Sequence, residues 1–193
     1  MKKILLLAGA MMCFLSFKAH AVTTVDSVDL TRYVGQWYEI ASMPQWFQKE
    51  CVGGVQAKYS TLPNGRIQVA NSCLLADGTR KVTLGEAKVT DKNTNAKLRV
   101  TFAKVFNKYI YTFGGDYWVI DLEPNYKYAV VGHPTLKFGW ILARDAKLSD
   151  DDLLLIADNL KSQGYDTCKF ITTVQEGGIQ QKVRLCDYLK GRQ

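Results

Sequence analysis

The chain has 193 residues, of which 47% are hydrophobic and 22% charged, and its 25 lysines and arginines outnumber its 18 acidic residues. This length and apolar content fit one domain with a substantial core. The basic residues are spread along the chain and form no run or stripe of the kind that nucleic-acid binding requires, so nucleic acid is excluded as an expected partner.

The N-terminus is typical of a bacterial secretory signal peptide. Met1-Lys2-Lys3 gives a basic start, an apolar stretch follows over 4–17, and Ala19-His20-Ala21 forms a small-residue cleavage site. The apolar stretch is too short for a membrane span. We expect a cleaved signal peptide at 1–21, a single domain at 22–193, and a periplasmic or secreted protein.

Two properties of the mature chain follow from this cleavage. Loss of three lysines leaves 22 basic residues against 18 acidic ones, a net charge of about +4, which permits transient contact with an anionic membrane surface. Cys13 would be the lipid-bearing residue of a lipoprotein signal, but such signals need small residues just before the cysteine. Met11-Met12 stand there, so we expect no lipid anchor.

Four cysteines remain after cleavage, and an even number in an exported protein favours two disulfides over metal or redox chemistry. No Cys-x-x-Cys pair occurs. Of the three connectivities, we favour Cys51 with Cys73 and Cys168 with Cys186. The alternative joins Cys51 or Cys73 to a C-terminal cysteine and ties the tail to the rest of the fold.

Gly35-Gln36-Trp37 opens the first alternating apolar segment of the mature chain. A glycine permits close approach at a tight corner, and an indole two residues later points to the same face of an extended chain. We therefore predict that Trp37 plugs the narrow end of a closed sheet. The loop over 43–47 then interrupts the strand pattern with Trp46 and Phe47, and it could fold over an opening as a lid.

Short apolar segments separated by turn residues fill the middle of the chain. Asn64-Gly65 between two such segments is a strong hairpin signal, and the alternation over 97–102 predicts a half-buried strand. After the first strand, we expect strands at 55–62, 67–71, 81–90, 97–102, 117–122, 126–132, 140–143 and 169–174.

One helix is predicted, over 149–164. Ser149 is a good N-cap, three aspartates follow it, and Gly164 suits the C-terminal cap. Leu153, Ile156, Ala157 and Leu160 form an apolar stripe. The pattern predicts an all-β fold: an eight-stranded antiparallel up-and-down barrel, wide enough for one small ligand, with the helix packed outside and a ninth strand after it.

Several motifs resemble those of a lipocalin over essentially the whole mature chain. They are Gly35-x-Trp37, the segment Trp140 to Arg144, and the late helix followed by one strand. More narrowly, residues 37–41, 43–44, 67–71 and 85–87 are similar to the branch that holds the bacterial lipocalin Blc and apolipoprotein D.

This resemblance implies that Arg144 lies across Trp37 and closes the barrel floor with Gly35, a structural role. A guanidinium stacks favourably on an indole face. One motif departs from the family pattern: the usual Thr-Asp-Tyr between the sixth and seventh strands is replaced by Glu123-Pro124-Asn125-Tyr126. This departure leaves the fold unaffected but puts partner recognition at that end in doubt.

The resemblance also places Trp140 inside the barrel, and strand alternation then sorts the remaining walls. The alternative for Trp140 is a packed core residue in a barrel too full for ligand. Asp121 points either inward or outward and receives no function. Lys104 and Lys108 could attract an anionic head group or simply be solvated. We expect a ligand-binding cavity lined by Tyr59, Val69, Asn71, Val100, Phe102, Tyr117, Val119, Tyr128 and Trp140.

Such walls suit an acyl chain or a flat apolar molecule. The expected function is carriage of a small hydrophobic ligand, a fatty acid or lysophospholipid, in envelope lipid storage or transport, by a monomer, with a dimer as the alternative. No enzyme activity, cofactor or metal is expected, and His133, beside a proline, is interpreted as a surface residue. The alternatives are a thiol-dependent, isomerase-like enzyme on the same fold and a secreted interaction or virulence protein.

Overall fold

The computed structural model describes residues 21–192. The predicted leader up to His20, including Cys13, lies outside these residues, so signal cleavage and the absence of a lipid anchor stay predictions. Within the described part of the chain, no helix is long and apolar enough to cross a membrane.

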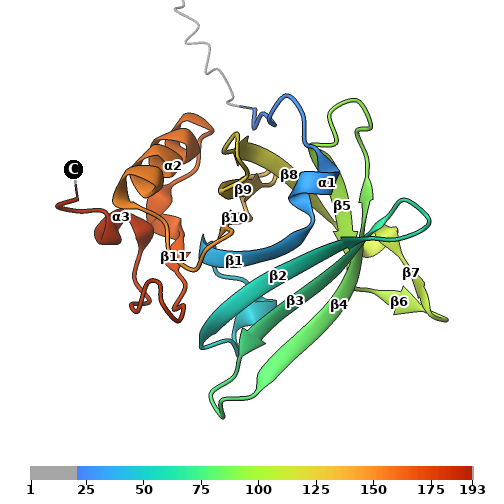
Figure 1. Cartoon of the computed structure of the whole chain (residues 1–193), viewed down its shortest axis with the longest axis horizontal. Helices are drawn as coiled ribbons and strands as arrows, with labels where there is room; N and C mark the ends of the chain where they lie inside the picture. The colour runs from blue at the N-terminus through green and yellow to red at the C-terminus, as the bar shows by residue number, and fades with distance from the viewer. Residues whose placement is uncertain (1–20, 193) are drawn as a thin grey trace, which may run out of the picture.

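The fold is a closed antiparallel β-barrel of eight strands, with a ninth strand beside the first (Figure 1). Strand β10 returns to pair with β1, where Ala143 lies opposite Tyr38, and this closure removes the sheet edge at that point. The predicted fold class is confirmed. The barrel strands are β1 (Gly35–Ser42), β2 (Gly53–Thr61), β3 (Ile67–Leu74), β4 (Arg80–Val89), β5 (Lys97–Thr101), β8 (Gly115–Leu122), β9 (Tyr128–Gly132) and β10 (Gly139–Ala143).

Side chains alternate between the barrel interior and an outer core that lies under the helix. Trp37 and Val131 belong to the interior cluster, whereas Ile40, Val130 and Ile141 belong to the outer cluster. Strands β9 and β10 therefore contribute buried residues to both faces, which explains why their sequences are continuously apolar instead of alternating.

Helix α2 (Asp150–Ser162) covers that outer core, as predicted. Its buried residues are the four of the expected stripe, Leu153, Ile156, Ala157 and Leu160. Ser149 caps the helix: its hydroxyl accepts a hydrogen bond from the Asp152 backbone N–H at 3.2 Å, and the Asp152 carboxylate accepts one from the Ser149 N–H at 3.3 Å. This reciprocal capping box fixes where the helix begins.

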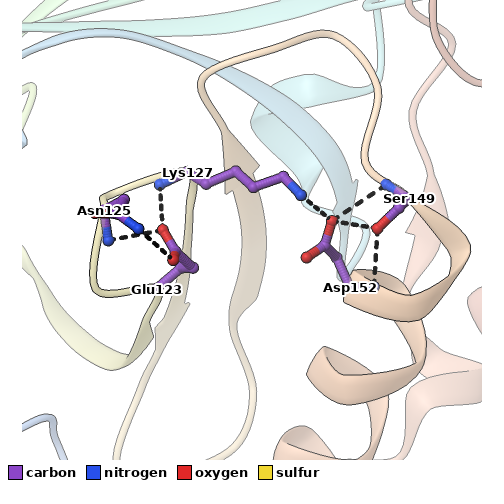
Figure 2. Close-up of polar contacts among 5 residues, drawn as sticks. All are labelled: Glu123, Asn125, Lys127, Ser149 and Asp152. Carbon is purple, nitrogen blue, oxygen red and sulfur yellow. Dashed lines mark hydrogen bonds and ion pairs between the residues drawn. The ribbon is translucent and has the colours of Figure 1, made fainter.

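Lys127 joins the turn between β8 and β9 to the start of α2 (Figure 2). Its ammonium group donates to the carboxylate of Asp152, which also holds the Ser149 hydroxyl. Within the turn, the Glu123 carboxylate accepts from the backbone N–H groups of Asn125 at 2.8 Å and Lys127 at 3.1 Å. Glu123 thus supplies the acid that orders this turn, and the departure from the Thr-Asp-Tyr pattern leaves the fold unaltered.

The segment after α2 completes the barrel wall where β1 and β2 separate. β1 pairs with β2 only over residues 35–38, and beyond them it pairs with β11 (Ile171–Thr172). The Gln175 side-chain amide then donates to the carbonyls of Glu39 at 2.9 Å and Val55 at 2.7 Å. The ninth strand, β11, is shorter than the predicted strand 169–174. After Thr172 the chain crosses from β1 toward β2, and individual hydrogen bonds hold it there instead of a regular strand ladder.

Several short elements were not predicted from the sequence. They include a two-stranded hairpin between β5 and β8. In addition, β4 pairs with β5 only over residues 86–89, so the first half of β4 has no strand partner on that side among the described residues. The additional elements are α1 (Leu30–Tyr33), η1 (Trp46–Gln48), β6 (Lys104–Val105), β7 (Lys108–Tyr109), η2 (Tyr111–Phe113), η3 (Thr167–Lys169) and α3 (Leu185–Tyr188).

The two disulfides follow the favoured connectivity. Cys51 pairs with Cys73, which ties the loop after β1 to the end of β3. Cys168 pairs with Cys186, which ties η3 to α3 within the C-terminal segment.

Candidate functional site

The barrel floor is built around Trp37, whose side chain is fully buried. Its indole N–H donates to the Tyr33 carbonyl at 2.8 Å, and the Arg144 guanidinium carbon lies 3.7 Å from the ring centroid. Gly35 has φ +100°, and a Cβ there would lie 3.2 Å from an Arg144 nitrogen. The glycine of Gly-x-Trp therefore makes room for the arginine that covers the tryptophan.

Helix α1 seals the same end, a contribution that the sequence reasoning missed. Asp29 caps it by accepting from the Thr31 backbone N–H at 2.8 Å and from the Thr31 hydroxyl at 2.7 Å, and these bonds lower the pKa of the Asp29 carboxyl. The helix brings the Tyr33 ring into the barrel, where it stacks on Tyr59 with the ring centroids 5.9 Å apart. An aspartate cap before Leu30 was the available signal.

Three tyrosine hydroxyls meet above this floor. The Tyr117 hydroxyl lies 2.8 Å from that of Tyr33 and 3.2 Å from that of Tyr59. Burial raises the pKa of Tyr59 to about 12 and raises the pKa values of Tyr33 and Tyr117 as well, so all three are neutral phenols. Three O–H donors share two contacts, and each contact uses one proton, so one donor is left for another acceptor.

The walls above the tyrosines are largely apolar. Val69, Val119 and Leu98 are buried in the interior cluster, with Val100 and Trp140 partly buried against it. The Oδ1 atom of Asn71 is also buried, and it has no hydrogen-bond partner. The barrel interior thus combines apolar side chains with one acceptor and one donor that have no hydrogen-bond partner, and the residues of this set that were not predicted are Tyr33 and Leu98.

Two predicted site residues lie elsewhere. Tyr128 belongs to the outer core against α2, so the expectation that it lines the lumen is wrong; Ala129 and Val131 face inward instead. Because β9 is buried on both faces, sequence parity could not select its inward face. Phe102 keeps the inward parity of Val100 but lies at the rim, 43% exposed.

Asp121 points outward, because the register between β8 and β9 shifts between Val119 and Asp121. Its carboxylate accepts from the Asn159 amide of α2 at 2.8 Å. Burial raises the pKa of this carboxyl. The outward alternative is the correct one, and the residue belongs to the interface between barrel and helix.

The loops that follow β1, β3, β5 and β9 lie at the end of the barrel opposite the floor, which we call the open end. In the first loop, the predicted lid, Trp46 is 77% exposed and packs edge-on against Phe47 at 5.7 Å between centroids. Lys104 and Lys108 stand on the unpredicted hairpin of the third loop. Both side chains are exposed, and their attraction of an anionic head group stays a prediction.

A cavity of about 250 Å³ lies between the first loop, the end of β1 and the segment 171–174. Its buried carboxylate, Glu39, accepts from the Ser42 hydroxyl at 3.0 Å, the Thr173 hydroxyl at 2.7 Å and the Gln48 amide at 2.9 Å. These donors satisfy a carboxylate that has no cation partner among the described residues. They also link the loop to the C-terminal segment.

Catalytic groups are sparse in residues 21–192. All four cysteines of this part are in disulfides, and no group of three or more His, Cys, Asp or Glu residues there is arranged to hold a metal ion. His133 lies partly exposed in the turn after β9, and its Nδ1 is 2.9 Å from the Thr135 hydroxyl.

A closed eight-stranded barrel with a sealed floor and largely apolar interior side chains is the architecture of the small-ligand-binding β-barrel class. The family model described as "Lipocalin-like domain" matches residues 28–175. The chain is 35% identical to temperature-induced lipocalin-1 of Arabidopsis thaliana over 152 residues, covering 78% of this chain and 81% of the relative. It is also 35% identical to outer membrane lipoprotein Blc of Escherichia coli over 160 residues, covering 81% and 84%.

Mouse apolipoprotein D is 35% identical over 158 residues, with 78% of each chain covered. Among solved structures, insecticyanin from the tobacco hornworm Manduca sexta shares the fold, with a TM-score of 0.64 and 24% identity over 80% of this chain and 85% of that one. The chain belongs to the lipocalin family, whose members bind small hydrophobic ligands.

Proposed function

We propose that this protein is an exported carrier that binds one fatty acid or lysophospholipid in its barrel and serves lipid storage or transport in the cell envelope. The observation that carries the proposal is the lumen, in which apolar walls surround the buried, unpartnered Asn71 Oδ1. Removal of apolar ligand surface from water contributes about 25 cal/mol for each Å², before the entropic costs of binding.

The polar groups set the chemistry of the ligand's other part. The tyrosine trio offers one O–H donor and Asn71 offers one acceptor. A hydroxyl or a protonated carboxyl group can use both, and an ester or a carboxylate can accept from the tyrosine donor, whereas a pure hydrocarbon would leave both unused. We therefore favour amphiphilic lipids over hydrocarbons.

The alternatives lack such an observation. A thiol-dependent enzyme needs a free cysteine, and the four cysteines of residues 21–192 are all in disulfides. No feature of the described surface favours a virulence partner over a lipid. The envelope location rests on the predicted leader and on the name of the relative Blc as an outer membrane lipoprotein.

The test is a titration of the delipidated mature protein with oleic acid and, separately, with a lysophosphatidylethanolamine. Tryptophan fluorescence is the readout of binding. We expect saturable binding of one ligand per chain. The Trp140→Phe variant should lose most of the fluorescence change, whereas the matched Trp46→Phe variant, altered in the exposed first loop, should keep it. The carrier function would be refuted if neither lipid bound and if organic extracts of protein purified from its native host contained no lipid.

A further inference from the structure

The large exposed apolar side chains are unevenly distributed over the barrel. Phe106 is 96% exposed and Phe113 is 76% exposed, and like Trp46 they stand on loops at the open end. None of the large exposed apolar residues of the described chain lies in the closed-end turns 62–66, 90–96 and 123–127. One end of the molecule therefore presents aromatic residues to its surroundings.

The most exposed of them is at the tip of the β6–β7 finger, which we define as residues 103–110. β6 and β7 pair with Val105 opposite Lys108, so Phe106 and Asn107 form the two-residue turn. Both have positive φ values, 46° and 61°. Such a turn favours Asn-Gly, and a bulky side chain at positive φ is disfavoured. Phe106 thus lacks both a packing and a conformational reason to be there.

The base of the finger is firmly attached to the barrel. The Ile110 N–H donates to the Ala103 carbonyl at 3.0 Å, and the Thr101 hydroxyl donates to the Ile110 carbonyl at 2.9 Å. Just beyond, the Tyr111 hydroxyl donates to the buried Glu86 carboxylate at 2.9 Å. The β6–β7 hairpin projects from the barrel (Figure 1), and Phe106 stands in its turn.

The charge of the finger is of one sign. Lys104 and Lys108 flank the tip, and residues 102–114 contain no aspartate or glutamate. The Lys104 ammonium lies 4.3 Å from the Tyr109 ring centroid. An exposed aromatic flanked by lysines with a tyrosine one residue further down suits a bilayer interface, where apolar groups enter the acyl boundary and cations meet lipid phosphates.

We propose that the β6–β7 finger docks the protein on anionic phospholipid bilayers, with Phe106 inserted between lipid head groups and Lys104 and Lys108 on the phosphates. The docking rests on the proposed carrier function only for its purpose, which is to bring the open end of the barrel to its source of lipid. A second copy of the chain would need an acidic or apolar recess to receive the finger, whereas the basic flanks match an anionic surface directly.

The experiment is co-sedimentation of ligand-free mature protein with vesicles of 30% phosphatidylglycerol in phosphatidylcholine, and with vesicles of phosphatidylcholine alone. Phe106→Asn should weaken partitioning by about tenfold or more, because an inserted phenyl ring is lost. The double variant Lys104→Gln/Lys108→Gln should lose most of the preference for phosphatidylglycerol. Each lysine removed should weaken binding to the phosphatidylglycerol vesicles by roughly fivefold at low salt. Leu155→Asn, at a 54% exposed position on α2, is the matched control and should bind like the wild type.

Asn tolerates positive φ, so Phe106→Asn should keep or raise the Tm while vesicle binding falls. Unchanged vesicle binding by Phe106→Asn would overturn the proposal. So would a change in oligomeric mass without a change in vesicle binding, which would identify a second copy as the occupant. The soluble fatty-acid titration separates the two proposals: a finger variant that binds ligand normally but not vesicles supports docking, and vesicle binding by a protein that takes up no ligand contradicts only the carrier function.

Discussion

The guanidinium of Arg144 lies flat over Trp37, 3.7 Å from its centroid, and at the same time donates to the backbone carbonyls of Gln36 at 2.8 Å, Val34 at 3.1 Å and Tyr33 at 3.2 Å. One side chain from the end of β10 therefore joins the start of β1 to helix α1. It supplies hydrogen-bond donors to carbonyls at the partly buried junction between α1 and β1.

We expect Arg144→Ala to lower the free energy of unfolding by about 2–4 kcal/mol, because the stacking and several charge-assisted hydrogen bonds to partly exposed carbonyls are lost together. Arg144→Lys should recover only a small part, since an ammonium group lacks the planar fork. Urea denaturation gives both values. Ligand affinity measured well below the transition should not change, and a large loss of affinity in a folded variant would contradict the structural role.

Gly35→Ala tests the space reserved for that arginine. The substitution places a Cβ 3.2 Å from an Arg144 nitrogen and forces alanine to φ +100°. Gly65→Ala is the matched control, because Gly65 also has positive φ but a Cβ added there would meet nothing within 4 Å. We expect Gly35→Ala to be the more destabilising by at least about 1 kcal/mol. In the Arg144→Ala background this excess should shrink.

Asn71→Leu tests the unpartnered acceptor in the lumen. Removing a buried carbonyl that has no partner should raise the free energy of unfolding of the empty protein by about 1–2 kcal/mol. Thr83→Val, directly opposite on β4, should stay within about 0.5 kcal/mol of wild type. If Asn71 binds the lipid's polar group, the same Leu variant must also bind oleic acid more weakly, and tighter binding would exclude that role.

The disulfides predict a free-thiol count of zero in the mature protein under denaturing, non-reducing conditions. Replacing either pair by serines should cost about 3 kcal/mol of stability, the effect expected for bridges that close loops of 22 and 18 residues. The two losses should differ in location. Hydrogen exchange should rise in the first loop, 43–52, without Cys51–Cys73, and around α3 without Cys168–Cys186.

Asp121 gives the stability a defined pH dependence. The pKa of Asp121 is higher in the folded protein than in the unfolded chain. Protonation of Asp121 therefore stabilises the folded state below about pH 4, and this contribution is lost as the pH rises through the folded pKa. Asp121→Asn should therefore raise the Tm at pH 7, and the gain should fade as the pH approaches 4. Asp77→Asn is the control of opposite sign, because hydrogen bonds from Thr79 lower the pKa of Asp77. Equal responses of the two variants would contradict the assignment.

The sequence predicted those parts of the fold that depend on local patterns. Ser149 with its aspartates placed α2, and Asn64-Gly65 placed the β2–β3 hairpin. The position of Arg144 over Trp37 came instead from the resemblance to a family, since 107 residues separate them and no local pattern joins them.

The parts that could not be predicted have physical reasons. A strand buried on both faces carries no parity signal, so Tyr128 was placed on the wrong side. A register shift turned Asp121 outward, and such shifts leave no mark in composition. The β6–β7 finger exposes its apolar residues, so the usual link between apolar pattern and burial fails for it. Helix α1 has four residues, too few for a periodic signal.

The position of Gln175 has a consequence for how this chain folds. Its amide spans from the Glu39 carbonyl to the Val55 carbonyl and closes the wall between the first two strands, yet it is 18 residues from the C-terminus. A chain synthesised from its N-terminus cannot complete this part of the wall until residue 175 has emerged, because Gln175 lies 136 positions after Glu39 and 120 positions after Val55. Closure of the wall between β1 and β2 is therefore a long-range step in folding.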